Sequence, residues 1–68
     1  MDKQRIGMVE DGLLTVAEAE QITGLKKSKL YLLMASGQLP YCKIGSARRI
    51  PRRALLELMA RNLVIRND

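Results

Sequence analysis

The stretch that decides the fold is residues 26–53, which read KKSKLYLLMASGQLPYCKIGSARRIPRR. It holds eight lysines and arginines and no aspartate or glutamate, whereas the whole chain of 68 residues has a net charge of +5. The cations are therefore concentrated in one part of the chain. Apolar residues interrupt them, and Gly37 and Gly45 mark turns. A basic block inside a folded sequence indicates a surface that binds a polyanion, most commonly nucleic acid.

The first part of this stretch predicts a helix over about residues 27–36, which ends at Gly37, where a helix-ending glycine belongs. Three apolar residues recur at the spacing of one helix face and are expected to point inward: Leu30, Leu33 and Met34. Lysines at the beginning of this helix oppose its dipole, so they do not serve helix stability. That local cost suggests that they bind a partner.

A shorter helix is predicted just before it. Thr15, followed three residues later by Glu18, forms a capping box at its start, and Gly24 follows its end. Its inward residues are expected to be Val16, Ala19 and Ile22. Two short helices joined by a turn that contains glycine form a helix-turn-helix, whose second helix enters the major groove of DNA.

A β-hairpin is predicted after the second helix. Residues 39–44 form an extended segment, residues 45–47 a tight turn, and residues 48–50 the returning strand. Alternation places Ile44 and Ile50 on the inward side. A basic hairpin that follows a helix-turn-helix is a wing, which can contact the phosphate backbone or the minor groove.

The third helix is predicted from Pro51 to about Asn62, because proline suits the first turn of a helix. Its inward residues are expected to be Leu55, Leu58 and Met59. The apolar residues 63–65 continue past its expected end. Either the helix runs on and packs against the domain, or these residues offer a surface to a partner.

The predicted fold is therefore mainly α with a small two-stranded β wing, in the order helix, turn, helix, two strands, helix. Residues 13–62 are expected to form this winged helix-turn-helix domain. Residues 1–12 are expected to form a flexible leader without clear periodicity, and residues 63–68 a C-terminal tail.

Composition excludes several classes of function. The chain has no histidine and one cysteine, so it cannot form an intrachain disulfide or a His/Cys zinc site. It offers no base beside a serine or cysteine, so neither enzymatic activity nor a cofactor is expected. No run of ~18 apolar residues or signal peptide is present, which predicts a cytoplasmic protein. A membrane-surface peptide is the rival binding class, but short punctuated helices disfavour it.

Several short motifs occur in a characteristic order: Leu14-Thr15-Val16 with Glu18-Ala19, Thr23-Gly24-Leu25, Leu30-Tyr31 with Leu33-Met34, Ser36-Gly37, Leu39-Pro40, Lys43-Ile44-Gly45 and Arg48-Arg49-Ile50-Pro51-Arg52. In this combination the chain resembles the excisionase-type, MerR-related winged helix-turn-helix family of bacterial and phage proteins. The resemblance implies a nucleoid-associated protein that binds double-stranded DNA. Its implied role is that of an excisionase, which bends attachment-site DNA and assists an integrase, with copy-to-copy contacts on the DNA. The alternative role is that of a small transcriptional regulator.

The charge pattern and the resemblance together give the residues expected to contact DNA: Lys26, Lys27, Ser28, Lys29, Tyr31, Lys43, Ser46, Arg48, Arg49 and Arg52. Tyr31 is equally suited to core packing, and Arg49 is expected to lay its stem on Tyr41. The chain departs from the resembled family at Leu32 and Ala35, where basic residues are frequent. Leu32 is expected to be exposed and to meet either a thymine methyl group or a protein partner.

Overall fold

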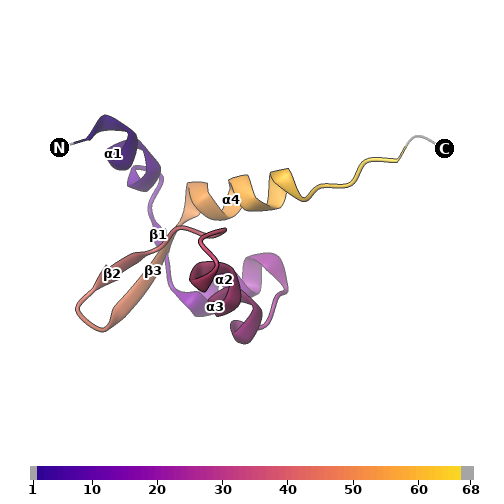
Figure 1. The fold of residues 1–68 in the computed structure, drawn as a ribbon, viewed down its shortest axis with the longest axis horizontal. Coiled ribbons are helices and arrows are strands. Elements are labelled where there is room, and N and C mark those ends of the chain that lie inside the picture. Colours follow the sequence, from indigo (N-terminus) through magenta and orange to yellow (C-terminus); the bar gives the residue numbers. More distant parts are fainter. Residues whose placement is uncertain (1, 67–68) are drawn as a thin grey trace.

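The computed structural model describes residues 2–66; Met1 of the predicted leader and residues 67–68 of the predicted tail lie outside them. The elements of the described part are α1 (Lys3–Val9), β1 (Leu13–Leu14), α2 (Val16–Thr23), α3 (Lys27–Ala35), β2 (Cys42–Ile44), β3 (Ala47–Pro51) and α4 (Arg52–Arg61). In Figure 1 the α2–α3 pair and the β2–β3 hairpin lie on one side of α4. The predicted fold class, mainly helical with a β wing in a winged helix-turn-helix, is confirmed.

The start of α2 is fixed by the predicted capping box. The Glu18 backbone amide donates to Thr15 Oγ1 at 3.1 Å, and the Thr15 amide donates to Glu18 Oε1 at 2.9 Å. The backbone hydrogen bond from Thr15, with a smaller contribution from the Thr15 side chain, lowers the pKa of Glu18 below its usual value. The helix ends at Gly24, whose φ of 72° is left-handed and whose amide donates to the Glu20 carbonyl.

A small aliphatic core joins α2, α3, the sheet and α4. Its buried residues are Leu14, Ala19, Leu30, Met34, Leu39, Ile50, Ala54, Leu55 and Leu58. Leu39 and Ala54 were not predicted as core residues. Gly37, at a φ of 82°, turns the chain back after α3, and the Leu39 amide donates to the Leu33 carbonyl at 3.1 Å. This return brings Leu39 under the helices, where it is completely buried.

Two residues expected in the core are exposed, and those predictions were wrong. Ile44 is 66% exposed because it ends β2 next to the hairpin tip, beyond the reach of the helices. Ile22 is 42% exposed in the last turn of α2, where Ala19 alone is buried. The small Ala19 is the point at which α2 comes closest to its neighbours.

The sheet has one strand more than predicted. β1 pairs antiparallel with β3, placing Leu13 opposite Pro51 and Leu14 opposite Ile50, so the strand order is β1-β3-β2. A strand of two residues is too short to show alternation in the sequence. Through this pairing the wing is continuous with the start of the domain.

The N-terminal segment contains a helix that the sequence did not predict. The Asp2 side chain caps α1 by accepting from the Gln4 amide at 2.9 Å. Beyond α1, Asp11 lies 3.2 Å from Arg53 Nε, and the Gly12 carbonyl accepts from the Arg52 amide at 3.0 Å. These contacts tie the segment to the beginning of α4.

The third predicted helix is confirmed as α4, with Pro51 at its N-cap. The helix does not run on beyond the predicted end. The Asn62 side chain donates to the Leu58 carbonyl at 2.8 Å, and the chain then leaves α4 as an extended segment (Figure 1). The apolar residues of this segment are exposed: Leu63, Val64 and Ile65.

Leu30 and Leu32 give a matched test of the core. Leu30 is completely buried and Leu32 is 64% exposed in the same helix. Leu30→Ala should lower the free energy of unfolding by about 2–5 kcal/mol, from the lost burial and the cavity it leaves. Leu32→Ala should change it by no more than about 0.5 kcal/mol. Urea denaturation followed by circular dichroism measures both, and equal losses would contradict the described register of α3.

The capping box predicts a pH dependence of stability. Because the pKa of Glu18 is lowered in the folded state, its contribution is present above the unfolded pKa and is lost as the pH falls through the folded pKa. Glu18→Ala should therefore be less stable than the wild type at neutral pH, and the difference should shrink on acidification. Thermal melts over the acidic range measure this, and a difference that grows at low pH would be inconsistent with the capping box.

Candidate nucleic-acid interface

The outer face of α3 is directed away from the core. Leu30 and Met34 are buried on the inner face, while Ser28, Leu32 and Ala35 are exposed on the opposite side. In a helix-turn-helix this outer face of the second helix enters the major groove. The predicted Ser28 thus lies on the face that is free to meet base edges.

The beginning of α3 is a cationic helix start. Lys26 is the N-cap and makes no side-chain capping bond among the described residues, and the first turn contains no acidic residue. Lys26, Lys27 and Lys29 are all exposed. Positive charge at the positive end of the helix dipole is unfavourable, and an anion placed there relieves it. A phosphate group suits this position.

The wing carries a second unfavourable charge arrangement. In the β2–β3 register Lys43 lies directly opposite Arg48. Like charges that face each other across two strands destabilise a hairpin. The turn beyond them presents Ser46, which is exposed. Both the helix start and the wing therefore hold cations whose repulsion a bound polyanion would relieve.

Arg48 joins the wing to α3. Its guanidinium carbon lies 5.1 Å from the centre of the Tyr31 ring and 5.0 Å from the centre of the Tyr41 ring. Lys27 Nζ lies 5.9 Å from the centre of the same Tyr31 ring. Cations at such distances are attracted to aromatic faces by about 0.5–1 kcal/mol at exposed sites. Tyr31, which also packs against the edge of the core, thus holds cations from two elements together.

Arg49 is directed elsewhere, and the expectation that it packs on Tyr41 was wrong. Arg48, opposite Lys43, shares the wing face that carries Tyr41, whereas Arg49 lies opposite Cys42. Arg49 donates from Nη1 to the Arg48 carbonyl at 2.9 Å. Its charge is close enough to Glu18 to contribute to the lowered pKa of that carboxylate, as the smallest of the causes.

Tyr41 was not predicted as part of the site. The sequence carried a signal for it, because alternation along β2 places Tyr41 on the same side as Lys43. Pairing Lys43 with Arg48 in the hairpin would have brought Arg48 to the tyrosine. The missing information was the hairpin register, which depends on the turn.

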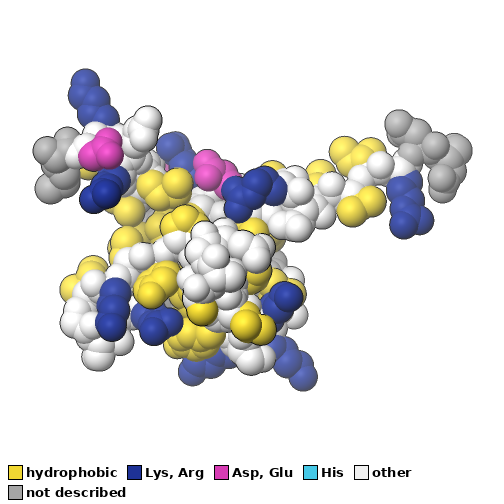
Figure 2. All heavy atoms as spheres, viewed as in Figure 1, with side chains coloured by type: hydrophobic (Ala, Val, Ile, Leu, Met, Phe, Trp, Pro, Cys, Tyr) yellow, Lys and Arg dark blue, Asp and Glu magenta, His cyan; other side chains and the backbone are white. Residues whose placement is uncertain are grey.

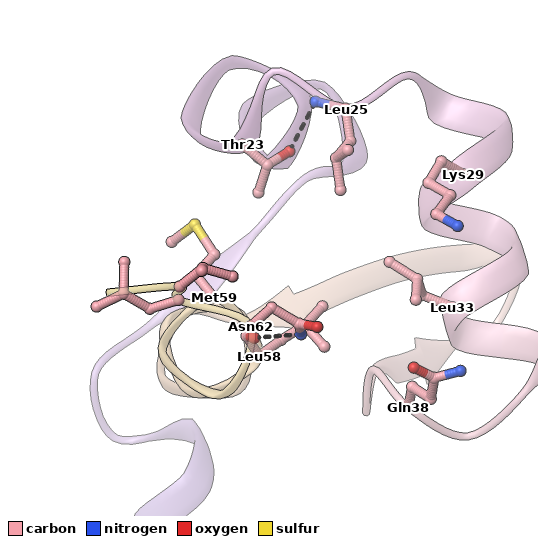
Figure 3. Close-up of a pocket in the computed structure, with 10 residues that line it drawn as sticks. Thr23, Leu25, Lys29, Leu33, Gln38, Leu58, Met59 and Asn62 are labelled. Carbon is pink, nitrogen blue, oxygen red and sulfur yellow. Dashed lines mark hydrogen bonds between the residues drawn. The ribbon is translucent and has the colours of Figure 1, made fainter. Parts of the chain in front are cut away.

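Lys29 lies on a different side of α3 from Lys27. Together with Leu33 it borders a groove of about 650 Å³ between the helix-turn-helix and the end of α4 (Figure 3). The remaining lining residues are Thr23, Leu25, Gln38, Leu58, Met59, Asn62, Leu63 and Val64. Lys29 is therefore separated from the cluster of Lys27, Tyr31 and Arg48.

Arg52 is likewise outside that cluster. It is exposed in the first turn of α4, and the hydrogen bond of its amide to Gly12 places it beside the N-terminal segment. Its neighbour Arg53 is paired with Asp11. The structure thus brings together Lys27, Tyr31, Lys43 and Arg48 and leaves Lys29 and Arg52 at the periphery.

Charge on the surface is unevenly distributed. In the view of Figure 2 the visible acidic side chains lie over α1 and α4, while Lys and Arg side chains surround the lower part, which contains α3 and the hairpin. Apolar side chains lie between these cations. No helix in residues 2–66 is long and apolar enough to cross a membrane.

Comparisons with known proteins agree with this geometry. Residues 13–63 match the family model described as a helix-turn-helix domain. A curated protein of Saccharopolyspora erythraea, named a probable excisionase, is 49% identical over 49 residues, which is 72% of this chain and 50% of that protein. The chain thus spans about half the length of the curated relative it matches. No solved structure matches the chain. The resemblance to excisionase-type helix-turn-helix proteins is confirmed by these matches, which do not bear on the relation to MerR.

The pair of Lys43 and Arg48 predicts opposite effects of one substitution on stability and on binding. Lys43→Glu replaces a like-charge cross-strand pair with an attractive one, which should raise the free energy of unfolding by about 0.2–1 kcal/mol. The same change should weaken binding to duplex DNA because the wing loses a cation and gains an anion. Urea denaturation and fluorescence anisotropy measure the two quantities.

Arg66→Glu is the control, because it changes the net charge equally on the exposed C-terminal segment. It should leave stability unchanged and weaken binding much less. If Lys43→Glu lowered stability, or if both variants bound DNA equally well, the wing would not be the cationic contact described.

Proposed function

This chain belongs to the helix-turn-helix domain family, a DNA-binding fold, and we propose that it acts as an excisionase. In this role it binds attachment-site DNA in the cytoplasm, bends it and assists an integrase during excision. The observation that carries the DNA-binding part is the Arg48 guanidinium between Tyr31 and Tyr41, which makes α3 and the wing one cationic surface. The relative named a probable excisionase supports the specific role.

The proposed binding mode assigns different tasks to the parts of this surface. The outer face of α3 enters the major groove, with Ser28 nearest the base edges. Lys26 and Lys27 neutralise phosphates at the helix start. Lys43, Ser46 and Arg48 contact the backbone or the adjacent minor groove from the wing.

DNA bending follows from the fixed distance between α3 and the wing. Bending a site costs about 1–6 kcal/mol, and additional contacts made possible by the bend offset that cost. Because Arg48 holds the wing against α3, the two elements cannot spread to follow straight DNA, so the DNA bends to meet both. A further set of contacts on the bent DNA comes from neighbouring copies and from the integrase.

A small transcriptional regulator of the same fold is the alternative. It would use the same surface on promoter DNA and would not change the yield of recombination. The identity of 49% to a probable excisionase over the folded domain favours the first role.

Salt dependence tests the DNA-binding surface. With roughly four to seven phosphates neutralised, log K should fall with log salt at a slope of about −4 to −6. Arg48→Ala should weaken binding about tenfold or more and reduce the slope by about 1, because one charged contact is lost. Lys3→Ala, on the exposed side of α1, serves as the control and should retain the slope. Absence of binding to any duplex at low salt would refute the proposal.

An excision assay tests the specific role. We expect a recombinase encoded beside this protein to excise its element efficiently only when the protein is present, and Arg48→Ala to lower the yield. The Lys3→Ala variant should support the wild-type yield. An unchanged yield without the protein would reject the excisionase role and leave the regulator, while the salt titration would still report on DNA binding.

A further inference from the structure

The most unusual side chain on the outer face of α3 is Leu32. It is 64% exposed in the middle of the helix, although a leucine gains about 1.5–3 kcal/mol from burial. The core is completed without it, by Leu30 and Met34 on the opposite face. Folding therefore gives no reason for a leucine at this position, and its role lies in what the helix meets.

We propose that Leu32 recognises the 5-methyl group of a thymine in the major groove. This inference rests on the proposed DNA binding and adds the base chemistry that the site selects. The exposed outer residues of α3 are Ser28, Leu32 and Ala35, and none of them is an arginine, asparagine or glutamine that could bond two atoms of a base. In the major groove the thymine methyl is the one apolar group on a base edge, and apolar side chains contact it.

The charges around Leu32 argue against a protein partner as its main occupant. Residues 26–53 contain eight cations and no acid, and Lys27 and Arg48 both lie beside Tyr31, the residue preceding Leu32. A second copy of the chain docked on this face would bring like charges together, which is unfavourable. Duplex DNA presents phosphates to these cations and a methyl group to the leucine at the same time.

Helix geometry places two readers on the DNA. Ser28 and Leu32 are four residues apart, or about 6 Å along the helix axis, and successive base pairs are about 3.4 Å apart. The hydroxyl of Ser28 therefore reaches a base edge about two steps from the thymine. The lysines and arginines supply affinity that does not depend on sequence, while Leu32 discriminates between bases.

The test uses duplexes selected by the wild-type protein from a random pool. Each thymidine of a selected site is replaced singly with deoxyuridine, which removes the methyl group and keeps the base pairing. At one or two thymines under α3, the wild type should lose about three- to fivefold in affinity. Leu32→Ala should bind the thymine duplex about as weakly as the wild type binds the uracil duplex, and should no longer distinguish the two.

Leu56→Ala is the matched control, because Leu56 is an exposed leucine on α4. This variant should keep the full preference for thymine over uracil. Circular dichroism of Leu32→Ala should match that of the wild type, since the replaced side chain is exposed.

Two results would overturn the inference. One is a selected duplex that binds with equal affinity whichever thymine is replaced. The other is a preference for thymine that persists in Leu32→Ala, and a change in the sedimentation of that variant would then assign Leu32 to a protein contact. Both results leave DNA binding intact, whereas failure of the wild type to select any duplex would refute the proposed function itself.

Discussion

The contact on which the proposed site depends is the placement of the Arg48 guanidinium between two tyrosine rings. Tyr31 belongs to α3, Arg48 to β3, and Tyr41 precedes β2. Without this contact the hairpin would be joined to the domain only through the β1–β3 pairing and the core beneath Ile50. With it, the cations of the wing and those of the helix start keep a fixed spacing, which is what recognition of a regular polyanion requires.

Electrostatic repulsion distinguishes this surface from an ordinary solvated one. Lysines surround the positive end of the α3 dipole, and Lys43 faces Arg48 across the hairpin. Elsewhere in the described structure charges are arranged favourably: Asp2 caps α1, Glu18 closes the capping box, and Asp11 pairs with Arg53. Unfavourable charge is thus gathered where a DNA backbone would relieve it, and the cost falls on a small domain whose stability is limited.

The helices of the domain could be predicted from sequence because their signals are local. The capping box of Thr15 and Glu18 and the glycines after α2 and α3 act within a few residues. Features that depend on distant contacts were missed: the strand β1, the burial of Leu39 and the exposure of Ile44. The same holds for the site. Its residue types could be predicted from charge and resemblance, but the role of Tyr41 and the separation of Lys29 from Lys27 follow from the hairpin register and from packing around α3.

The central claim is that α3 and the wing bind DNA as one surface held together by Arg48. Titration of the isotope-labelled protein with a bound duplex, followed by NMR, tests it most directly. We predict that the amide signals of residues 26–32 and 43–49 and the Arg48 side-chain signal shift together, with one midpoint, while those of α1 and residues 63–66 remain in place. Shifts confined to α1 and α4, or separate midpoints for the helix and the wing, would contradict it.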